Sequence, residues 1–576
     1  MDTVIQLQDA FKTHTLDQDK IISPEETVRR FKERATQLKL NILNKTERID
    51  NGRLDIPVFF SECGSDAKEV TGTNKQMGKG GTPEQSEASA VMELAERFSF
   101  FSFKNNPDNF ITAAYADVAS QALPFSMILQ SVHDEAGDQA VLRKIFETLP
   151  LKWTKGFNLT RGREVLIPFD WFYMINEFNG PSAGNCREEA ICQGICEIVE
   201  RHTSSLISHG RLRAPAIDPA SATDPMVRIL LDKYAGAGIV VHISDFTLGM
   251  GIPTVGVLAH DPATFPAMSE IVWTAGTAPD PQKAMSRALT ETAQLAGDFN
   301  TGSNYVASGL PKFTSLEDTA WVSDKSNVVG IRDLPDVSHN NIRVEVERCV
   351  ASLADRGMDV LLINTMHPGL GIPAFYTIVP GAHFRERAVG ASLGMFAARM
   401  MTETLEPGEA IRRLNHMERL MPGHYYTRFY LGLNHLKLDD PRVALGHLEK
   451  ALSLDPARLN IPDITSYMGV CLKDMGEYER AIGILKLGEA IDEQRTDLHN
   501  LQGFCHFKMK RYEKAIACFE KVIALDPGSA IDYANIASNY RELGNSEKAV
   551  DYYSIALKID PDLAFARENL ERLKRA

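Results

Sequence analysis

The C-terminal part of the chain repeats itself every 34 residues, after a first spacing of 37. The repeating units begin at Tyr425, Pro462, Thr496 and Ala530. Every unit has a small residue at its eighth place and an alanine at its twentieth: Gly432, Gly469, Gly503 and Ala537, and then Ala444, Ala481, Ala515 and Ala549. Small residues let two antiparallel helices approach closely, and Asp-Pro pairs near the ends of three units stop the second helix. The pattern predicts stacked helix pairs.

This repeat resembles the tetratricopeptide repeat (TPR), which it matches from Tyr425 to Pro561. The resemblance implies an all-α solenoid over residues 425–576, closed by a polar capping helix at 562–576, with a groove for a partner protein or peptide. A purely architectural solenoid, such as a dimerisation arm, is the alternative. Stacked repeats need neighbours for their apolar faces but do not always need ligands.

Residues 1–400 have a different pattern, in which short strands rich in β-branched and aromatic residues alternate with amphipathic helices. We expect an α+β catalytic domain here, with antiparallel sheets, joined to the repeats by a connecting helix at 401–424. Four segments that begin with Ile-Pro are interpreted as strand starts, where proline is tolerated: Ile56-Pro57, Ile167-Pro168, Ile252-Pro253 and Ile372-Pro373. The recurrence indicates duplicated strand–helix units, and chance recurrence of a common dipeptide is the alternative.

A charge pattern in the helices strengthens the case for duplication. Glu93-x-x-Glu96-Arg97 recurs as Glu197-x-x-Glu200-Arg201, and more loosely as Glu291-x-x-Gln294. On a helix, the first set lies within a sector of about 100°. A solvated helix face is the ordinary explanation of such a stripe. Two features favour a site instead: no lysine accompanies the carboxylates, and the first helix is otherwise too apolar to lie open to water.

Two pairs of converging carboxylates need a cation, and ligands that are all oxygen atoms favour magnesium over zinc. Carboxylates rarely hold magnesium alone, so a nucleotide phosphate is the expected third party. The run Gly78-Lys79-Gly80-Gly81 precedes the first helix and would bring backbone N–H groups or a lysine to such phosphates. A glycine-rich hairpin turn is the alternative, because the run lacks the full Walker pattern.

The chain resembles the YcaO family of ATP-dependent peptide-backbone-modifying enzymes in three segments: GKGGTPEQSEASAVMELAERFS, SAGNCREEAICQGICEIVERH and RALTETAQLAG. The resemblance implies an ATP site with two magnesium ions. The metal ligands that it implies are Glu93, Glu96, Glu197 and Glu200. The nucleotide contacts that it implies are Lys20, Thr27, Ser89, Asn185, Glu189, Gln193, Arg201, Arg287 and Glu291, and the catalytic residues would be Arg97 and Arg201.

In this family, ATP phosphorylates the oxygen of a peptide amide, and a nucleophile then attacks the activated carbon. Azoline-forming members typically end in a proline-rich tail, whereas this chain ends in ENLERLKRA. The chain therefore looks more like the bacterial member that is an accessory factor in methylthiolation of a small-subunit ribosomal protein. Thioamide formation with a separate partner protein is the runner-up. A non-catalytic ATP-binding scaffold that recruits a modifying enzyme through its repeats is the second class of function. We also expect a homodimer formed through the catalytic domain.

Charge and hydropathy argue against several other classes of protein. The formal net charge is −14 and no basic run occurs, so we expect no direct contact with nucleic acid. We find no uncharged apolar run of about 18 residues, which argues against a membrane protein. The acidic N-terminus is unlike a signal peptide. Eight cysteines without a C-x-x-C pair favour a reducing cytoplasm.

Two local motifs could indicate other chemistries, a serine nucleophile and a cysteine site, but their sequence context argues against both. The run Gly180-Pro181-Ser182-Ala183-Gly184 fits the G-x-S-x-G elbow of α/β-hydrolases, but polar residues 176–179 separate it from the apolar run before it. We interpret the run as a turn and a helix start. Cys192 and Cys196 are one turn apart on a helix already assigned to oxygen ligands, so we interpret them and Cys186 as small packing residues.

Overall fold

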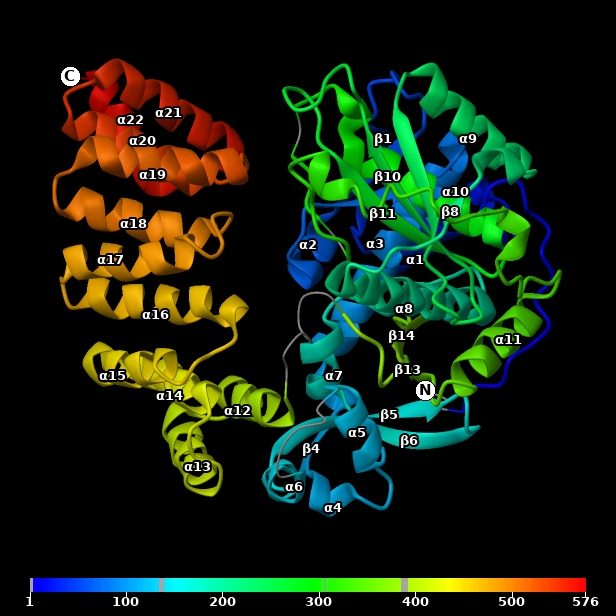
Figure 1. Ribbon diagram of the computed structural model, residues 1–576, viewed down its shortest axis with the longest axis horizontal. Helices are drawn as coiled ribbons and strands as arrows, with labels where there is room; N and C mark the ends of the chain where they lie inside the picture. The colour runs from blue at the N-terminus through cyan, green and yellow to red at the C-terminus, as the bar shows by residue number, and fades with distance from the viewer. Residues whose placement is uncertain (1–3, 134–138, 303, 308, 385–391, 576) are drawn as a thin grey trace. The chain divides into compact units, whose positions relative to one another are not determined.

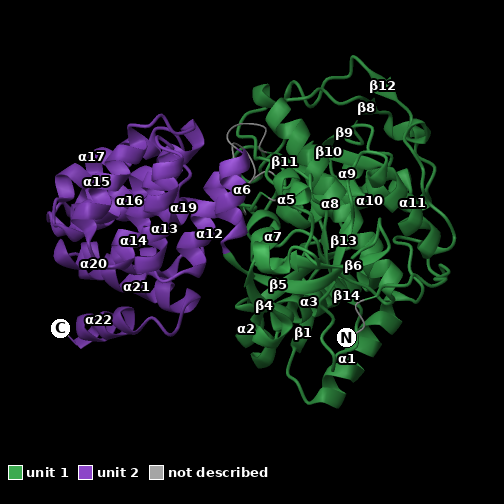
Figure 2. Cartoon of the chain, turned by 90° about the horizontal axis from the view of Figure 1, so that it is seen from below, with its two compact units in different colours: residues 1–135, 150–391 green, residues 136–149, 392–576 purple. Residues whose placement is uncertain are grey.

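The computed structural model describes residues 4–133, 139–302, 304–307, 309–384 and 392–575. Its contacts divide the chain into two compact units, which Figure 2 colours separately. Unit 1 comprises residues 1–135 and 150–391, and unit 2 comprises residues 136–149 and 392–576. Unit 2 therefore includes α6 (Gln139–Glu147), whose sequence lies within the range expected for the catalytic domain.

The described part of unit 1 contains three sheets (Figure 1). The first is an antiparallel meander of β1 (Leu43–Arg48), β2 (Val58–Cys63) and β3 (Lys75–Lys79). The second has the order β11 (Val272–Thr277), β10 (Thr254–His260), β9 (Val240–Asp245), β8 (Ala216–Ile217) and β12 (Val328–Val329), and its β8–β12 pair is parallel. The third is antiparallel, with the order β4 (Ile111–Ala114), β5 (Pro150–Asn158), β13 (Leu361–Asn364), β14 (Ala374–Ile378) and β7 (Pro181–Ala183), and β6 (Arg163–Pro168) also pairs with β5.

Each sheet carries one long helix of unit 1. The helix α3 (Pro83–Asn105) packs on β2 and β3, α10 (Pro281–Ala296) packs on β10 and β11, and α8 (Arg187–Gly210) packs on β7 and β14. In addition, α1 (Pro24–Leu38) packs on α3, and α11 (Ile342–Ala354) packs on α8. The remaining helices are α2 (Ser65–Thr71), α4 (Tyr115–Val118), α5 (Phe125–Gln130), α7 (Phe169–Asn176) and α9 (Pro225–Gly236), besides short 3-10 turns.

Two of these strand–helix units are copies of one another in detail. The hairpin β2–β3 leads into α3 as β10–β11 leads into α10. A Cβ atom on Gly78 would lie 2.1 Å from the backbone nitrogen of Ala90, and one on Gly276 would lie 2.5 Å from that of Ala288. At each glycine, the strand therefore lies directly against the backbone of the helix, at a residue twelve positions later in the sequence. This register aligns Glu93 with Glu291, so the expected duplication is seen in the units of α3 and α10.

The Ile-Pro expectation is correct at three of its four places. The dipeptide directly precedes β2, β10 and β14. At Ile167-Pro168 it is wrong, because these residues end β6 and Phe169 begins α7. Pro168 is the residue that caps α7, and the helix after it is buried on most of its faces. The apolar run that we interpreted as a strand is thus a short buried helix.

The described part of unit 2 has helices and no strand, and it contains the expected repeats as four helix pairs. The pairs are α14 (Tyr425–Lys437) with α15 (Pro441–Leu452), α16 (Ile461–Asp474) with α17 (Tyr478–Glu489), α18 (Thr496–Lys508) with α19 (Tyr512–Leu525), and α20 (Ala530–Glu542) with α21 (Ser546–Ile559). Before them lie α12 (Leu393–Thr404) and α13 (Pro407–Leu420), and α22 (Ala564–Arg575) follows them.

The small residues of the repeat do what their spacing predicts. A Cβ atom on Gly469 would lie 2.5 Å from Leu485 Cδ2, and one on Gly503 would lie 2.8 Å from Phe519 Cε1. The eighth place of a unit thus contacts a bulky side chain of the second helix of the same pair, Leu485 or Phe519. In the described part of the whole chain, we find no helix with the length and hydropathy that a membrane span requires.

Candidate active site

One cavity of about 440 Å³ in unit 1 brings together all the residues that the sequence predicts for the site. They come from the N-terminal segment, from α1, from the three long helices α3, α8 and α10, and, for Asn185, from the turn before α8. The predicted residues that line the cavity are Lys20, Thr27, Ser89, Glu93, Glu96, Arg97, Asn185, Glu189, Gln193, Glu197, Glu200, Arg201, Arg287 and Glu291. Each carboxylate stripe therefore faces this cavity.

The carboxylates of α3 lie beside an arginine of their own helix. Arg97 donates to Glu93 Oε1 from Nη2 at 2.8 Å and from Nε at 3.0 Å. The Nε atom also lies 3.6 Å from Glu96 Oε1. One turn of helix thus carries two acids and one base.

The carboxylates of α8 repeat this arrangement more loosely. Arg201 Nη2 lies 3.9 Å from Glu197 Oε1 and 4.0 Å from Glu200 Oε1. Backbone N–H groups orient the other oxygens, because Gly180 donates to Glu197 at 3.2 Å and Thr277 donates to Glu200 at 3.2 Å. Among the described residues, no three His, Cys, Asp or Glu side chains already form a metal-binding group. The acids are held as two separate pairs.

The electrostatics of the two pairs favour an added cation. Burial raises the pKa of Glu96 well above its ordinary value, and the neighbouring Glu93 raises it further. Burial also raises the pKa of Glu197, although Arg201 and Arg97 oppose this shift. Because the two arginines do not balance the carboxylates, the charged forms of these acids are costly without a further positive charge. The donor set is all oxygen, which suits magnesium.

The hydrogen-bonding capacity of the arginines, in turn, is only partly used. Three buried guanidinium nitrogens, Arg97 Nη1, Arg201 Nε and Arg287 Nε, have no hydrogen-bond partner among the residues that the structure describes. Buried N–H groups in proteins normally have an acceptor. Phosphate oxygens are acceptors that guanidinium groups bind well. Carboxylates that need a cation and arginines that need an anion together fit a magnesium–nucleotide complex.

The N-terminal segment and α1 complete another side of the cavity around Glu189. The backbone N–H of Ile21 donates to Glu189 Oε1 at 2.7 Å, and Lys20 Nζ lies 3.9 Å from Glu189 Oε2. The Asn185 side chain donates to Glu189 Oε2 at 3.0 Å, and Thr27 Oγ1 donates to Asn185 Oδ1 at 3.0 Å. Polar groups far apart in the sequence are thereby fixed beside one another.

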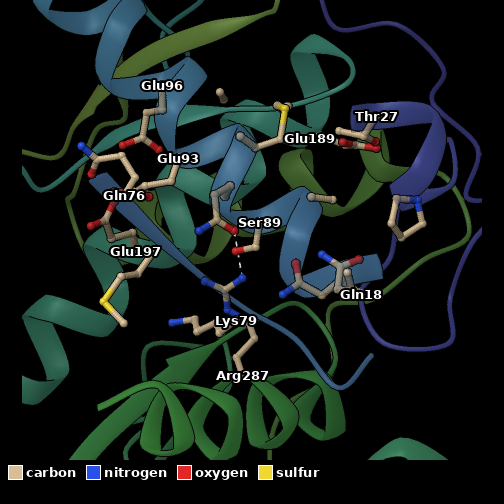
Figure 3. A pocket seen from close by; sticks show the side chains of 18 of the residues that line it. Gln18, Thr27, Gln76, Lys79, Ser89, Glu93, Glu96, Glu189, Glu197 and Arg287 are labelled. Carbon is tan, nitrogen blue, oxygen red and sulfur yellow. Dashed lines mark hydrogen bonds between the residues drawn. The ribbon is translucent and has the colours of Figure 1, made fainter. Parts of the chain in front are cut away.

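Between these two sides lie the polar groups of β3 and α10. Arg287 Nη1 donates to Gln193 Oε1 at 3.0 Å, and Lys79 forms an ion pair with Glu291. Figure 3 shows Glu93, Glu96 and Glu197 together on one side, Thr27 and Glu189 on another, and Lys79 beside Arg287. The glycine-rich run before α3 thus ends β3 and brings a lysine side chain to the cavity.

Sequence reasoning missed several polar residues of this lining. They are Gln18, Lys75, Gln76, Gln85 and Gln294. Gln294 occupies the fourth place of the loose third copy of the charge pattern, so the signal for it was present. Gln76 and Lys75 are on β3, where nothing in the local sequence marks a strand that faces a site.

The other motifs have structural roles. Ser182 lies in β7, where its buried hydroxyl donates to the backbone oxygen of Phe375 at 3.5 Å. A nucleophile elbow would expose this serine at a strand-to-helix turn instead. Cys192 and Cys196 are free and buried. Cys186 caps α8, with its sulfur accepting from the Glu189 N–H at 3.5 Å.

The fold and site have relatives among known proteins. The chain is 27% identical over 380 residues to a protein of Methanothermobacter thermautotrophicus, which covers 62% of this chain and 94% of that relative. It is 28% identical over 232 residues to the ribosomal protein S12 methylthiotransferase accessory factor YcaO of Escherichia coli, which covers 38% of each chain.

Two solved structures share the fold. A heterocyclase in complex with substrate and cofactor superposes with a TM-score of 0.54 at 23% identity, over 66% of this chain and 54% of that one. YcaO from Methanopyrus kandleri, bound with AMPPCP and Mg²⁺, superposes with a TM-score of 0.50 at 21% identity, over 67% of this chain and 98% of that one.

Family models cover both units. Tetratricopeptide repeat models match residues 496–529 and 533–563. The model of the YcaO cyclodehydratases, described as ATP- and Mg²⁺-binding, matches residues 77–383, which include α3, α8 and α10. With its carboxylate and arginine helices around one cavity, the chain belongs to the YcaO family, and it carries TPR repeats at its C-terminal end.

Proposed function

We propose that this chain uses ATP and Mg²⁺ to activate a peptide-backbone amide in a protein or peptide substrate. The observation that carries the proposal is the complementary charge of one cavity, where four carboxylates, two of them with raised pKa values, face three arginines with unpartnered N–H groups. ATP would supply the phosphoryl group that turns the amide oxygen into a leaving group, with magnesium neutralising its charge. Membership of an ATP- and Mg²⁺-binding family supports the same conclusion.

The residues of the cavity would have three roles: metal binding, contact with the phosphoryl oxygens, and nucleotide binding. Glu93 and Glu96 on α3, with Glu197 and Glu200 on α8, would hold the metal ions. Arg97 and Arg201 would direct N–H groups at charge that develops on the phosphoryl oxygens, which is the largest source of catalysis in such reactions. The residues that would bind the nucleotide are Lys20, Thr27, Ser89, Asn185, Glu189, Gln193, Arg201, Arg287 and Glu291.

Binding and turnover test the proposal separately. In the full chain, we expect Mg²⁺-dependent binding of AMPPCP, measured by calorimetry, and loss of this binding in Glu197→Ala/Glu200→Ala. The matched control is Glu347→Ala, which removes an exposed carboxylate that pairs with Arg343 on α11 and should change nothing. Undiminished, metal-dependent binding in the double variant would refute the metal assignment. Phosphate release that appears only with peptide or protein substrates would support amide activation.

We further propose that the activity serves modification of a protein, as in an accessory factor for ribosomal-protein methylthiolation. Similarity to the Escherichia coli accessory factor over part of both chains supports this, as do the TPR repeats, which are typical of protein recognition. Thioamide formation with a partner protein is the alternative. Mass spectra of cellular proteins with and without the gene distinguish them, because a thioamide exchanges oxygen for sulfur whereas methylthiolation adds a methylthio group.

A scaffold without turnover remains the candidate from another class, because the repeats can recruit a modifying enzyme. A chain that binds ATP but hydrolyses none with any partner would support it.

We also propose that residues 1–400 form the catalytic domain, 401–424 the connection and 425–576 the partner-binding solenoid, and that the catalytic domain dimerises. Light scattering of the full chain and of a chain without residues 425–576 tests dimerisation, and calorimetry with AMPPCP and Mg²⁺ tests the domain assignment: the shortened chain should remain a dimer and bind nucleotide.

A further inference from the structure

The three carboxylate helices differ in how their acids are neutralised. In α3, Glu93 pairs with Arg97 four positions later, and in α8, Glu197 lies beside Arg201 at the same spacing. The register between the two copied units aligns Glu93 with Glu291 and Arg97 with Leu295. Leu295 is partly buried against the apolar core of the second sheet. The third helix therefore has no arginine four positions after its carboxylate, and its Arg287, four positions before Glu291, donates to Gln193 instead.

Lys79 supplies the missing positive charge from the other copy. It is the last residue of β3, and it forms an ion pair with Glu291 of α10. The side chains of Lys79 and Glu291 are 21% and 16% exposed, so the pair is largely withdrawn from water. The residue aligned with Lys79 in the second copy is Thr277, whose backbone N–H donates to Glu200 at 3.2 Å.

The surroundings make the charge of Lys79 costly. Burial lowers the pKa of Lys79 to about 7. Arg287 and Arg201 add to this shift, and Glu200 and Glu93 offset part of it. A buried carboxylate that loses its only paired cation takes up a proton or another cation instead. Without Lys79, Glu291 would become an unpaired oxygen ligand in a cavity that already holds the four carboxylates of α3 and α8.

We propose that Lys79 is a built-in cation that neutralises Glu291 and so confines divalent metal ions to the carboxylates of α3 and α8. Lys79 is then a positioning residue, which acts on the metal site through Glu291. The inference rests on the proposed metal and nucleotide site and deepens it, because it states which of the three carboxylate helices take metal. It also accounts for Gln294 at the place where the other helices have the second glutamate, since a helix neutralised by lysine needs no metal ligand there.

The test counts bound metal ions. Mn²⁺ serves as the probe, with and without AMPPCP, and electron paramagnetic resonance gives the number bound per full-length chain. At AMPPCP concentrations that saturate every variant, we expect two ions in the wild type, a third in Lys79→Met, and two again in Lys79→Met/Glu291→Gln. Lys79→Arg keeps the charge and should bind two. The same count in Lys79→Met as in the wild type, or a third ion that persists in the double variant, would overturn the proposal.

Thermal unfolding of the metal-free protein tests the pairing of Lys79 with Glu291 independently of the metal site. Lys79→Met should lower the thermal midpoint of the apo protein, and adding Glu291→Gln should restore it, because the unpaired carboxylate is then removed. A midpoint that the second substitution fails to restore would refute the pairing. A wild type that binds no Mn²⁺ even with AMPPCP would refute the proposed function, whereas restoration of the midpoint would still support the role of Lys79 as the cation for Glu291.

Discussion

The backbone N–H of Ile21 donates a hydrogen bond of 2.7 Å to Glu189 Oε1, although 168 positions separate the two residues. This bond fixes the N-terminal segment to α8 at the edge of the cavity. We predict that Glu189→Ala speeds amide exchange at Ile21 about tenfold or more, because a bond to a charged acceptor contributes about 1.5–3 kcal/mol. Hydrogen–deuterium exchange of the nucleotide-free protein measures this.

The same helix offers the control for that experiment. Glu188 Oε1 accepts from the backbone N–H of Gln8 at 2.7 Å. Glu188→Ala should therefore speed exchange near Gln8 and leave Ile21 unchanged. Equal exchange at Ile21 in both variants and in the wild type would show that the bond does not restrain the segment.

The raised pKa values of Glu96 and Glu197 predict that metal binding releases protons. A carboxyl whose folded pKa lies above its unfolded value binds more protons in the native state, so the metal-free protein loses stability as pH rises from the unfolded value of 4.5 through the raised values. Metal ions need the charged forms and compete with these protons. Affinity for Mg²⁺ should therefore rise with pH across that window.

Calorimetry in buffers of different ionisation enthalpy measures the proton count. We expect protons to be released when Mg²⁺ binds at mildly acidic pH, and fewer as the pH rises further above the raised values. Proton uptake, or release that grows steadily towards alkaline pH, would contradict this account of the carboxylates.

Close contact between strand and helix predicts strong effects at two glycines. Gly78→Ala places a Cβ atom 2.1 Å from the Ala90 nitrogen, and Gly276→Ala places one 2.5 Å from the Ala288 nitrogen. The contacted atoms belong to the helix backbone and cannot rotate out of the clash as a flexible side chain could. Each change should therefore lower the free energy of unfolding of unit 1 by about 1–3 kcal/mol or more. Gly236→Ala, at the end of α9 with nothing within 4 Å, should be neutral or slightly stabilising. Urea unfolding of the three variants and the wild type measures these effects. Equal midpoints in all four would show that the strands can shift to relieve the clash.

The solenoid allows a similar test of a close glycine contact, with a double-mutant cycle of Gly469 and Leu485. Gly469→Ala brings a Cβ atom 2.5 Å from Leu485 Cδ2, whereas Gly483→Ala on α17 meets nothing within 4 Å. We expect the first to destabilise unit 2 by about 1–3 kcal/mol and the second to stabilise it by about 0.5–1 kcal/mol. In a Leu485→Ala background the penalty at Gly469 should largely vanish, and strict additivity in thermal unfolding would exclude this contact as its cause.

Sequence patterns predicted those features of the molecule that local periodicity determines. The stripe of Glu93, Glu96 and Arg97 faces the cavity because helix geometry alone puts these residues on one side. The solenoid followed from small residues such as Gly469 at fixed places. Ile167-Pro168 misled us, because a proline-led apolar run fits either a strand or the first turn of a buried helix. The pair of Lys79 with Glu291 could not be predicted, since it joins two copies of a motif through tertiary packing.

That pair has a consequence for how such a chain can change over time. The two copied strand–helix units do not balance their acids independently. Leu295 stands where the first copy has Arg97, and Glu291 of the second copy pairs with Lys79 of the first. A recombination that replaces either copy alone would break a charge balance that neither copy contains. The two copies therefore depend on one another for charge balance, and we expect positions 79 and 295 to vary together among related chains.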